Sequence, residues 1–433
     1  MNPSENTLPT ISDDLLLQCM HCGMCLPTCP TYVLTKRERS SPRGRIRLIK
    51  SMAEGKLNFT HEFITEMNFC LDCRACETAC PAGVHYGRII EETRRVIAET
   101  TKISYKTRIL RRLFLTGLFA KQKRLQLLAR VVRFYQKTGM EWFVLKFNLT
   151  GLFSKKLKQI APLSPKISAK FTKQLLPEFL PAHGETKYKV ALLTGCVQDI
   201  AFAETNLATA EVLVRNNCDV YIPQNQACCG SVHAHTGAVE LAKKNLLHNC
   251  AAFYIDTIDA LIINAAGCGS FLKESGEIFS LAEDAVAIKK LASKTRDISE
   301  FLCEINFRKP EAHLDLIVTY HDACHLAHGQ KIRSAPREII TSINGVILKE
   351  MRESDWCCGS AGVYNITHTE TANKLLDRKI RNIQSTNAEI IISANTGCSI
   401  QLAYGIRTSG SQLKIMHPID LLWRAYQAEE RNE

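Results

Sequence analysis

Two segments of the sequence, CMHCGMCLPTCP from position 19 and CLDCRACETACP from position 70, share one cysteine pattern. In each segment three cysteines recur at intervals of three residues, and a fourth follows four residues later, directly before a proline. The first run holds Cys19, Cys22, Cys25 and Cys29, and the second holds Cys70, Cys73, Cys76 and Cys80. Three thiolates spaced in this way can face one point and cap three irons of a cubane, whereas the fourth iron needs a ligand from elsewhere.

In two-cluster ferredoxins the cysteine before the proline binds the other cluster, which explains why such runs come in pairs. The pattern therefore predicts two 4Fe–4S clusters with crossed ligands. We expect one cluster to be held by Cys19, Cys22, Cys25 and Cys80, and the other by Cys70, Cys73, Cys76 and Cys29. Structural zinc usually takes two separated C-x-x-C hooks, so a zinc-binding basic interaction module is the alternative from a different functional class.

The remaining composition indicates the compartment and the size of the protein. The chain has 433 residues, enough for two to four domains. It opens MNPSENTLPT, without a basic start followed by an apolar run. No uninterrupted apolar stretch reaches the roughly 20 residues that cross a bilayer. We therefore expect a cytoplasmic protein, in which thiols stay reduced and clustered cysteines more often bind metal.

The segments that follow the two cysteine runs read as helices. SPRGRIRLIKSMAEG offers Ser40 or Ser41 as an N-cap, has Pro42 near the first turn and closes at Gly55. GRIIEETRRVIAET places its apolar residues on one helical face. Residues 1–101 are therefore predicted to form a helical ferredoxin-like domain. Its arginines either offset the cluster charge or belong to a solvated helix face.

The second half of the chain contains an internal repeat. One set of cysteines recurs as a second set after an offset of about 130 residues, and the pair in each set precedes Gly-Ser. The first set is Cys196, Cys228, Cys229 and Cys268, and the second is Cys324, Cys357, Cys358 and Cys398. Strand-like runs precede the single cysteines, and helix-like stretches alternate with them, which predicts two parallel α/β lobes over 187–308 and 309–433.

The eight cysteines of these repeats are candidates for a second redox or metal site, because open α/β sheets place their sites at the carboxyl ends of strands. The remnant of a former site is the structural alternative. Cys218, Cys250 and Cys303 stand outside the pattern and are expected to be small apolar fillers. Five histidines lie close to the repeat cysteines in sequence, and a packed or surface histidine is the commoner case. They are His233, His235, His321, His325 and His328.

Residues 102–186 form the predicted connector, and this part makes the protein basic. Residues 102–174 hold eighteen Lys and Arg but one acid, Glu141, whereas the whole chain has a net charge of +12. Leu110, Leu113, Phe114 and Leu118, then Leu125, Leu128 and Val132, are expected to share an apolar face. Such a helix either packs on the domains or a partner, or lies on an anionic membrane surface. A nucleic-acid role is disfavoured because no binding module accompanies the charge.

Taken together, these motifs resemble the iron–sulfur subunit of glycolate oxidase over nearly the whole chain. The resemblance rests on CMHCGMCLPTCPTY, SPRGRIRLIK, CLDCRACETACPAGVHY and CCGSAGVYNITH. Iron–sulfur components of lactate oxidation, anaerobic glycerol-3-phosphate dehydrogenase and heterodisulfide reductase have a similar layout. In heterodisulfide reductases each repeat ends in C-x-x-C and supplies five thiolates. Here Ala265 and Asn395 occupy the first position of that pair, so the resemblance does not extend to their non-cubane cluster.

The resemblance implies an electron-transfer subunit of an oxidoreductase complex that carries no catalytic residue of its own. Glycolate would be oxidised to glyoxylate on the FAD of a partner flavoprotein, and electrons would leave through the two 4Fe–4S clusters toward a quinone. This fits the sequence, which has no P-loop, no G-x-G-x-x-G after a strand and no nucleophile elbow. A lactate or glycerol-3-phosphate dehydrogenase complex is the alternative within the same class. The implied location is cytoplasmic, peripheral on the cytoplasmic face of the membrane.

Overall fold

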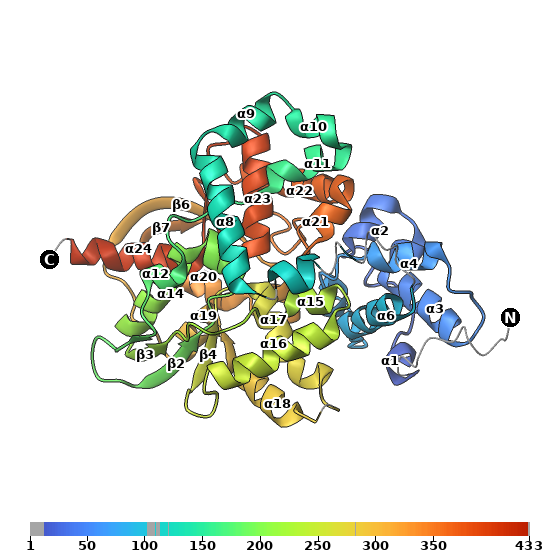
Figure 1. Cartoon of the computed structure of the whole chain (residues 1–433), viewed down its shortest axis with the longest axis horizontal. Coiled ribbons are helices and arrows are strands. Elements are labelled where there is room, and N and C mark those ends of the chain that lie inside the picture. Colours follow the sequence, from blue (N-terminus) through green and yellow to red (C-terminus); the bar gives the residue numbers. More distant parts are fainter. Residues whose placement is uncertain (1–12, 102–108, 110–112, 120, 282, 432–433) are drawn as a thin grey trace.

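The computed structural model describes residues 13–101, 109, 113–119, 121–281 and 283–431. Figure 1 shows the helical N-terminal part, in blue, at one end of the molecule, beside two α/β parts that carry the sheets. The helices that connect these parts in sequence, drawn in teal and green, run along the outside of the α/β parts. This is the mixed helical and α/β architecture that the sequence predicts.

The N-terminal part is a small helical domain. Its elements are α1 (Asp13–Leu17), α2 (Pro30–Thr35), η2 (Glu38–Ser40), α3 (Pro42–Ala53), α4 (His61–Asn68), α5 (Ala75–Thr78) and α6 (Tyr86–Thr100). Helix α3 begins as predicted, because the Ser41 side chain accepts a hydrogen bond from the backbone N–H of Gly44. Ile49 and Met52 of α3 pack with Ile89 of α6 in one buried core. The prediction of a helical ferredoxin-like domain is confirmed.

The first repeat is built on a five-stranded sheet of order β1-β3-β2-β4-β5. The strands are β1 (Phe179–Leu180), β2 (Tyr188–Leu192), β3 (Cys218–Tyr221), β4 (Ala260–Ile263) and β5 (Thr295–Asp297). Its helices are α12 (Thr172–Leu175), α13 (Val197–Ala201), α14 (Ala203–Arg215), α15 (Ser231–His235), α16 (Val239–Ala252), α17 (Ala266–Ile278), α18 (Ala285–Lys294) and α19 (Ile298–Glu304). Only β1 pairs antiparallel.

The second repeat has four parallel strands in the order β7-β6-β8-β9. They are β6 (His313–His321), β7 (Asn344–Leu348), β8 (Ile390–Ser393) and β9 (Lys414–Met416). Its helices are η5 (His325–Gly329), α20 (Ser334–Thr341), α21 (Tyr364–Thr367), α22 (Thr369–Gln384), α23 (Thr396–Thr408) and α24 (Pro418–Glu430). This order matches β3-β2-β4-β5 of the first repeat, so the repeated cysteine pattern reflects a repeated topology.

The two repeats share one hydrophobic core rather than meeting across a linker. Val190 of β2, Val318 of β6 and Leu422 of α24 all belong to a single buried cluster. The turns after β4 and β8 are also joined directly, since the backbone N–H of Ala266 donates to the carbonyl of Ala394 at 3.1 Å. The carboxyl ends of the two sheets, where the cysteines lie, therefore face each other.

The connecting segment is helical, as predicted, and it packs on the first repeat. It contains η3 (Leu113–Phe119), α8 (Gln122–Lys137), α9 (Met140–Lys146), α10 (Leu149–Phe153), α11 (Lys155–Ile160) and η4 (Ala161–Leu163). Leu125 and Ala129 of α8 are buried against the first repeat. Gln126 donates to the Asp199 carboxylate at 2.8 Å.

The predicted apolar face of this segment is partly wrong. Leu128 is 44% exposed and Leu113 is 62% exposed, because α8 buries the neighbouring face instead. Leu118 and Val132 do pack against the first repeat. Leu110 and the side chain of Phe114 lie outside the described residues. Among the described helices, none is both long enough and apolar enough to span a bilayer.

The glycine after each cysteine pair has a steric reason. Gly230 has φ +97° and Gly359 has φ +88°, a region that glycine reaches without strain. A Cβ on Gly359 would lie 2.6 Å from the carbonyl oxygen of Ala372 in α22. A Cβ on Gly230 would lie 3.1 Å from the Cα of Ala242 in α16. In both repeats the loop that carries the cysteine pair is thus pressed against a helix backbone.

Replacing Gly359 tests this packing, and Gly362 is the matched control. Gly362 also has positive φ (+64°), but a Cβ there would meet nothing within 4 Å. Gly362→Ala should cost about 1 kcal/mol of backbone strain. Gly359→Ala should cost about 1–3 kcal/mol more, because it also overpacks against α22. Thermal unfolding of the anaerobically purified chain measures both, and equal losses would show that α22 yields freely to the added methyl.

Candidate metal and redox sites

The structure brings one cysteine of the first run next to three of the second. Cys29, Cys70, Cys73 and Cys76 line one pocket. Each of the four is at most 9% exposed. We call this group the inner cluster site. It is the set that crossed ligation predicts, and its four sulfur donors surround a buried space, which fits a 4Fe–4S cluster.

A buried arginine holds the segments that form the inner cluster site. Arg45 of α3 also lines the cavity and is 0% exposed. Its Nε donates to the Glu66 carbonyl at 3.0 Å, and its Nη2 lies 3.2 Å from both the Glu66 carboxylate and the Thr31 hydroxyl. Thr31 in turn donates to the Ser40 carbonyl at 2.7 Å. Arg45 therefore connects α2, which follows Cys29, to α4, which precedes Cys70.

The surroundings of the inner cluster site act on the charge of its sulfurs in two opposing ways. Burial alone would lower the pKa of Arg45, but Tyr86, Cys70 and Cys29 raise it, so the guanidinium stays charged. Burial raises the pKa of Tyr86, whose protonated hydroxyl lies 3.5 Å from Cys70 Sγ as a donor. Burial also raises the pKa of Cys73 well above its usual value. A thiolate at this depth needs a cation beside it, which bound iron would provide.

The cysteines left over from the two runs are more exposed, and we call them the outer cluster site; Cys19, Cys25 and Cys80 pack against the same hydrophobic core of the cluster domain. The members of this site are Cys19, Cys22, Cys25 and Cys80; Cys22 is exposed and the other three are half-buried. Burial and the neighbouring Cys19 raise the pKa of Cys25. Arg43 stabilises the loop by donating to the His21 carbonyl at 2.9 Å and to Glu38 at 2.6 Å. The two predicted sites thus differ chiefly in exposure.

The four cysteines of the first repeat are brought together. Cys228 Sγ lies 3.5 Å from Cys196 Sγ, and Cys229 Sγ lies 3.1 Å from Cys268 Sγ. Hydrogen bonds with Cys196 and Cys229, and then one with His233, lower the pKa of Cys228 despite its burial. The group can therefore hold a thiolate, as a metal or redox site requires.

The cysteines of the second repeat form a corresponding row. Cys357 interacts with Cys324 and Cys358, and Cys358 with Cys398. Cys324 and Cys357 also pack beside Cys73 of the inner cluster site. Cysteines of the second repeat therefore pack directly against the inner cluster site.

An ionic network joins the cluster domain to both repeats. His235 Nδ1 of the first repeat lies 3.1 Å from the Glu91 carboxylate and 3.7 Å from that of Asp72. His325 Nε2 of the second repeat lies 2.9 Å from the Asp72 carbonyl. Hydrogen bonding and charge from His235 lower the pKa of Glu91 to about 2, against the effect of burial. Arg74 pairs with Glu91 at 3.8 Å and also with Glu274.

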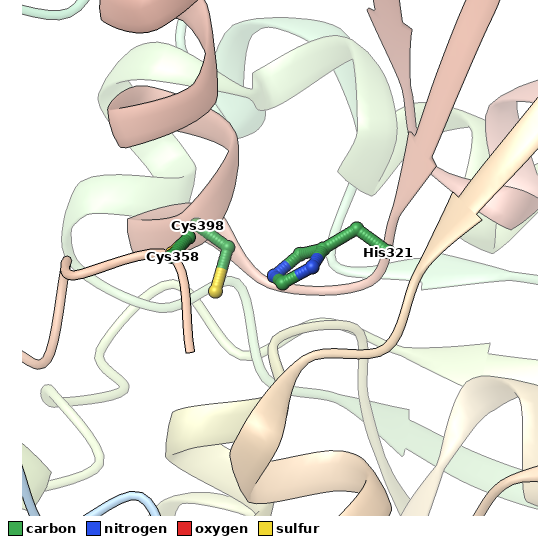
Figure 2. A group of neighbouring side chains, drawn as sticks. All are labelled: His321, Cys358 and Cys398. Atoms are coloured by element: carbon green, nitrogen blue, oxygen red, sulfur yellow. The ribbon is translucent and has the colours of Figure 1, made fainter. Parts of the chain in front are cut away.

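The sequence did not separate the roles of the five histidines, and the structure does. His235 and His325 belong to the ionic network, and His328 Nδ1 lies 2.8 Å from the Thr78 hydroxyl. His233 contacts Cys228. His321 faces Cys358 and Cys398 in the second repeat (Figure 2). Sequence reasoning missed Tyr86, Asp72 and Glu91, although Tyr86 and Asp72 lie inside or close to the second cysteine run.

The fold and the sites define an iron–sulfur protein with a dicluster domain and two cysteine-rich repeats. Residues 15–84 match the 4Fe-4S dicluster domain family, and residues 190–273 and 318–403 match the cysteine-rich domain family. Residues 106–163 match the linker region of the glycolate oxidase iron-sulfur subunit. The cofactor class predicted from the cysteine runs is confirmed.

Individual relatives agree with these matches. The chain is 38% identical over 418 residues to the probable glycolate oxidase iron-sulfur subunit of Bacillus subtilis, covering 95% of this chain and 94% of the relative. It is 33% identical to the glycolate oxidase iron-sulfur subunit of Escherichia coli, covering 98% of each. Lactate utilization protein A 2 of Bacillus mycoides is 28% identical over 54% of this chain and 98% of the relative. The chain belongs to the family of glycolate oxidase iron–sulfur subunits.

The charge on Arg45 can be tested against the inner cluster site, with the exposed Arg47 as the control. Reduction adds negative charge to a cluster, so Arg45→Met should lower the potential of one cluster and leave the other unchanged. Arg45→Lys should retain part of the effect, and Arg47→Met should have none. Redox titration followed by electron paramagnetic resonance measures each potential.

Breaking a buried ion pair costs about 3–5 kcal/mol, so Arg45→Met will also be less stable. The double variant Arg45→Met with Glu66→Gln also removes the carboxylate, which would otherwise keep only Arg39 as an ionic partner at 3.5 Å, and keeps the comparison possible. Unchanged potentials in both variants would mean that Arg45 has only a structural role.

Proposed function

We propose that this chain is the electron-transfer subunit of a glycolate oxidase complex. A partner flavoprotein with bound FAD oxidises glycolate to glyoxylate, and this chain receives the electrons. The observation that carries the proposal is the inner cluster site, where two distant cysteine runs meet in one buried cavity. Membership of the glycolate oxidase iron–sulfur subunit family over nearly the whole chain supports the choice of substrate.

We further propose that the clusters are ligated as the sequence predicts. Cys29, Cys70, Cys73 and Cys76 hold the inner one, and Cys19, Cys22, Cys25 and Cys80 hold the outer one. A bound 4Fe–4S cluster supplies a one-electron carrier, which a two-electron flavin donor needs. The chain contributes burial, the charge of Arg45 and the Tyr86 hydroxyl at the inner site, and an exposed approach for a partner at the outer site.

We infer that the chain divides into four parts: 1–101, 102–186, 187–308 and 309–433. The two repeat sheets support the last boundary, since β5 ends at Asp297 and β6 begins at His313. The boundary at 186 falls within a continuous structural unit, because β1 precedes it in sequence yet pairs with β3 of the first repeat.

The crossed ligands can be tested with three single variants. Cys29→Ser and Cys70→Ser should each lose the same cluster, whereas Cys22→Ser should lose the other one. Each variant should keep about four of the eight irons, and its remaining paramagnetic signal identifies the lost cluster. Cys218→Ser is the control, because this buried cysteine lies outside both runs. If Cys29→Ser instead loses the same signal as Cys22→Ser, each run holds its own cluster.

The substrate can be tested by deleting the gene. Relatives named lactate utilization protein A cover 54% of this chain, so lactate is the competing donor. The proposal predicts lost growth on glycolate and normal growth on lactate, and the reverse result would reject it. The deletion strain that carries the Cys70→Ser variant should still fail to grow on glycolate. This variant keeps the subunit but lacks the inner cluster, so the failure would be due to loss of the electron carrier rather than to absence of the subunit.

We also propose that the connector places the protein on the cytoplasmic face of the membrane, where a quinone accepts the electrons. Helices α9 and α10 and the turn between them carry exposed aromatic and aliphatic side chains, which we call the apolar patch. It consists of Trp142, Phe143, Phe147, Leu152 and Phe153, of which Leu152 and Phe153 are 82% and 83% exposed. Lys146 lies within this stretch of sequence, and Lys155, Lys156 and Lys158 directly follow it. Apolar side chains among cations suit an anionic lipid surface better than a neutral one.

Vesicle sedimentation tests this attachment. The chain should bind vesicles that contain phosphatidylglycerol and bind phosphatidylcholine vesicles weakly. Leu152→Ser with Phe153→Ser should weaken binding about tenfold or more, because two side chains no longer enter the interface. Leu281→Ser, at a fully exposed leucine elsewhere, is the control. Equal binding by the double variant would assign the apolar patch to another contact, such as the flavoprotein.

A further inference from the structure

A histidine and two cysteines of the second repeat converge at the carboxyl edge of its sheet. His321 is the last residue of β6, Cys358 lies in the loop before α21, and Cys398 lies in the first turn of α23. Their candidate ligand atoms all lie within 4.8 Å of one another. Figure 2 shows the imidazole of His321 extending from its strand toward the two cysteines. The three residues come from segments that are far apart in sequence, so the fold itself assembles the group.

The histidine of this group lacks the partners that a buried imidazole normally has. His321 is 0% exposed, and neither ring nitrogen makes a hydrogen bond of normal geometry with a described residue; the one polar group found beside the ring is the backbone of Ser354, at most a weak partner. A buried polar atom without a partner costs about 1–3 kcal/mol. Packing alone gives no reason for a histidine here, whereas a ligand bound by the ring would remove this cost.

Two cysteine sulfurs stand beside this unsatisfied ring. Cys358 is 1% exposed and Cys398 is 3% exposed. Cys398 Sγ accepts a hydrogen bond from Asn395 Nδ2 at 3.2 Å. Such hydrogen bonds orient metal-bound ligands and stabilise their charge. Asn395 occupies the position where a heterodisulfide reductase repeat would have another cysteine, so here this position supports a sulfur rather than supplying one.

We propose that His321, Cys358 and Cys398 bind a single zinc ion, at a site distinct from both iron–sulfur clusters. One imidazole nitrogen and two thiolates are ligands that zinc prefers, and three protein ligands leave one position of the tetrahedron for a water molecule or a further ligand. Two sulfurs bound to one tetrahedral zinc lie about 3.8 Å apart, as its bond length of about 2.3 Å requires. The observed grouping within 4.8 Å therefore needs only small side-chain shifts.

The site belongs to the second repeat alone. The cysteine offset of 128 residues aligns His321 with Leu193 of the first repeat, and Leu193 is packed in a hydrophobic core. The first repeat instead places His233 beside Cys228, from a different position in the fold. The histidine ligand at position 321 is therefore not part of the cysteine pattern that the two repeats share.

The surroundings also fit one divalent cation bound by two thiolates. The Lys379 ammonium is buried nearby and donates to the carbonyls of Glu353 and Ser354. The nearest acid in sequence, Asp322, is already paired with Arg337 at 2.7 Å. The Asp322 carboxylate is therefore already neutralised by an arginine, and zinc would balance the charge of its two sulfur ligands.

Metal analysis of the anaerobically purified full-length chain tests the proposal. The wild-type protein should contain eight irons and one zinc. His321→Leu, which introduces the residue of the first repeat, should lose the zinc and keep the eight irons. His321→Cys should keep the zinc, because a thiolate replaces the imidazole. Cys250→Ser, at a cysteine outside both repeat sets, is the control and should retain all metals.

Zinc X-ray absorption gives a readout independent of activity. The wild-type spectrum should show two sulfur neighbours and at least one nitrogen, and His321→Cys should show three sulfurs. Absence of zinc from the wild type, or zinc retained in His321→Leu, would overturn the proposal. More than eight irons that fall to eight in Cys398→Ser would overturn it in favour of an iron centre. The intact iron content of His321→Leu would show that this variant still folds.

Discussion

The buried ion pair between Arg45 and Glu66 is the interaction on which the cluster domain depends. A guanidinium removed from water is costly unless it is paired and hydrogen-bonded, and here a carboxylate, a carbonyl and a hydroxyl bind its Nε and Nη2, while Nη1 has no hydrogen-bond partner among the described residues. These partners lie on different segments of the domain, so the charge is stable only when the segments are in their native places. That requirement brings Cys29 to the cysteines of the second run. The same charge then stands beside the sulfurs and favours their ionised form.

Much of this organisation could be predicted from the sequence because the cysteines recur at the same spacing in both runs and in both repeats. The paired runs predicted the inner cluster site, and the repeated cysteines predicted two lobes of equal topology. Local capping signals also placed the start of α3 correctly at Ser41 and Pro42. The burial of Arg45 could also have been predicted from the helical period of α3. Pro42, Arg45, Ile46, Ile49 and Met52 form one buried stripe, and Arg45 stands where this period requires an apolar residue.

Other features could not be predicted because they depend on which surfaces meet. Leu128 fits an apolar helical period, but α8 rests on the first repeat through Leu125 and Ala129, so Leu128 faces outward. The roles of the histidines were equally hidden. His321 and His325 are four residues apart, yet one faces two thiols in its own repeat and the other contacts the backbone of Asp72 in the cluster domain. Proximity in sequence to a cysteine did not distinguish them.

The difference in exposure between the two cluster sites has a consequence for damage by oxygen. Dissolved oxidants reach thiolates and iron most easily where water does, and Cys22 is exposed while Cys29, Cys70, Cys73 and Cys76 are buried. Air would therefore attack the outer site first. The ion pair of Arg45 lies at the inner site, away from that attack. Oxidation that begins at Cys22 would accordingly leave the Arg45–Glu66 ion pair in place, because that pair lies beside the buried Cys29 and Cys70.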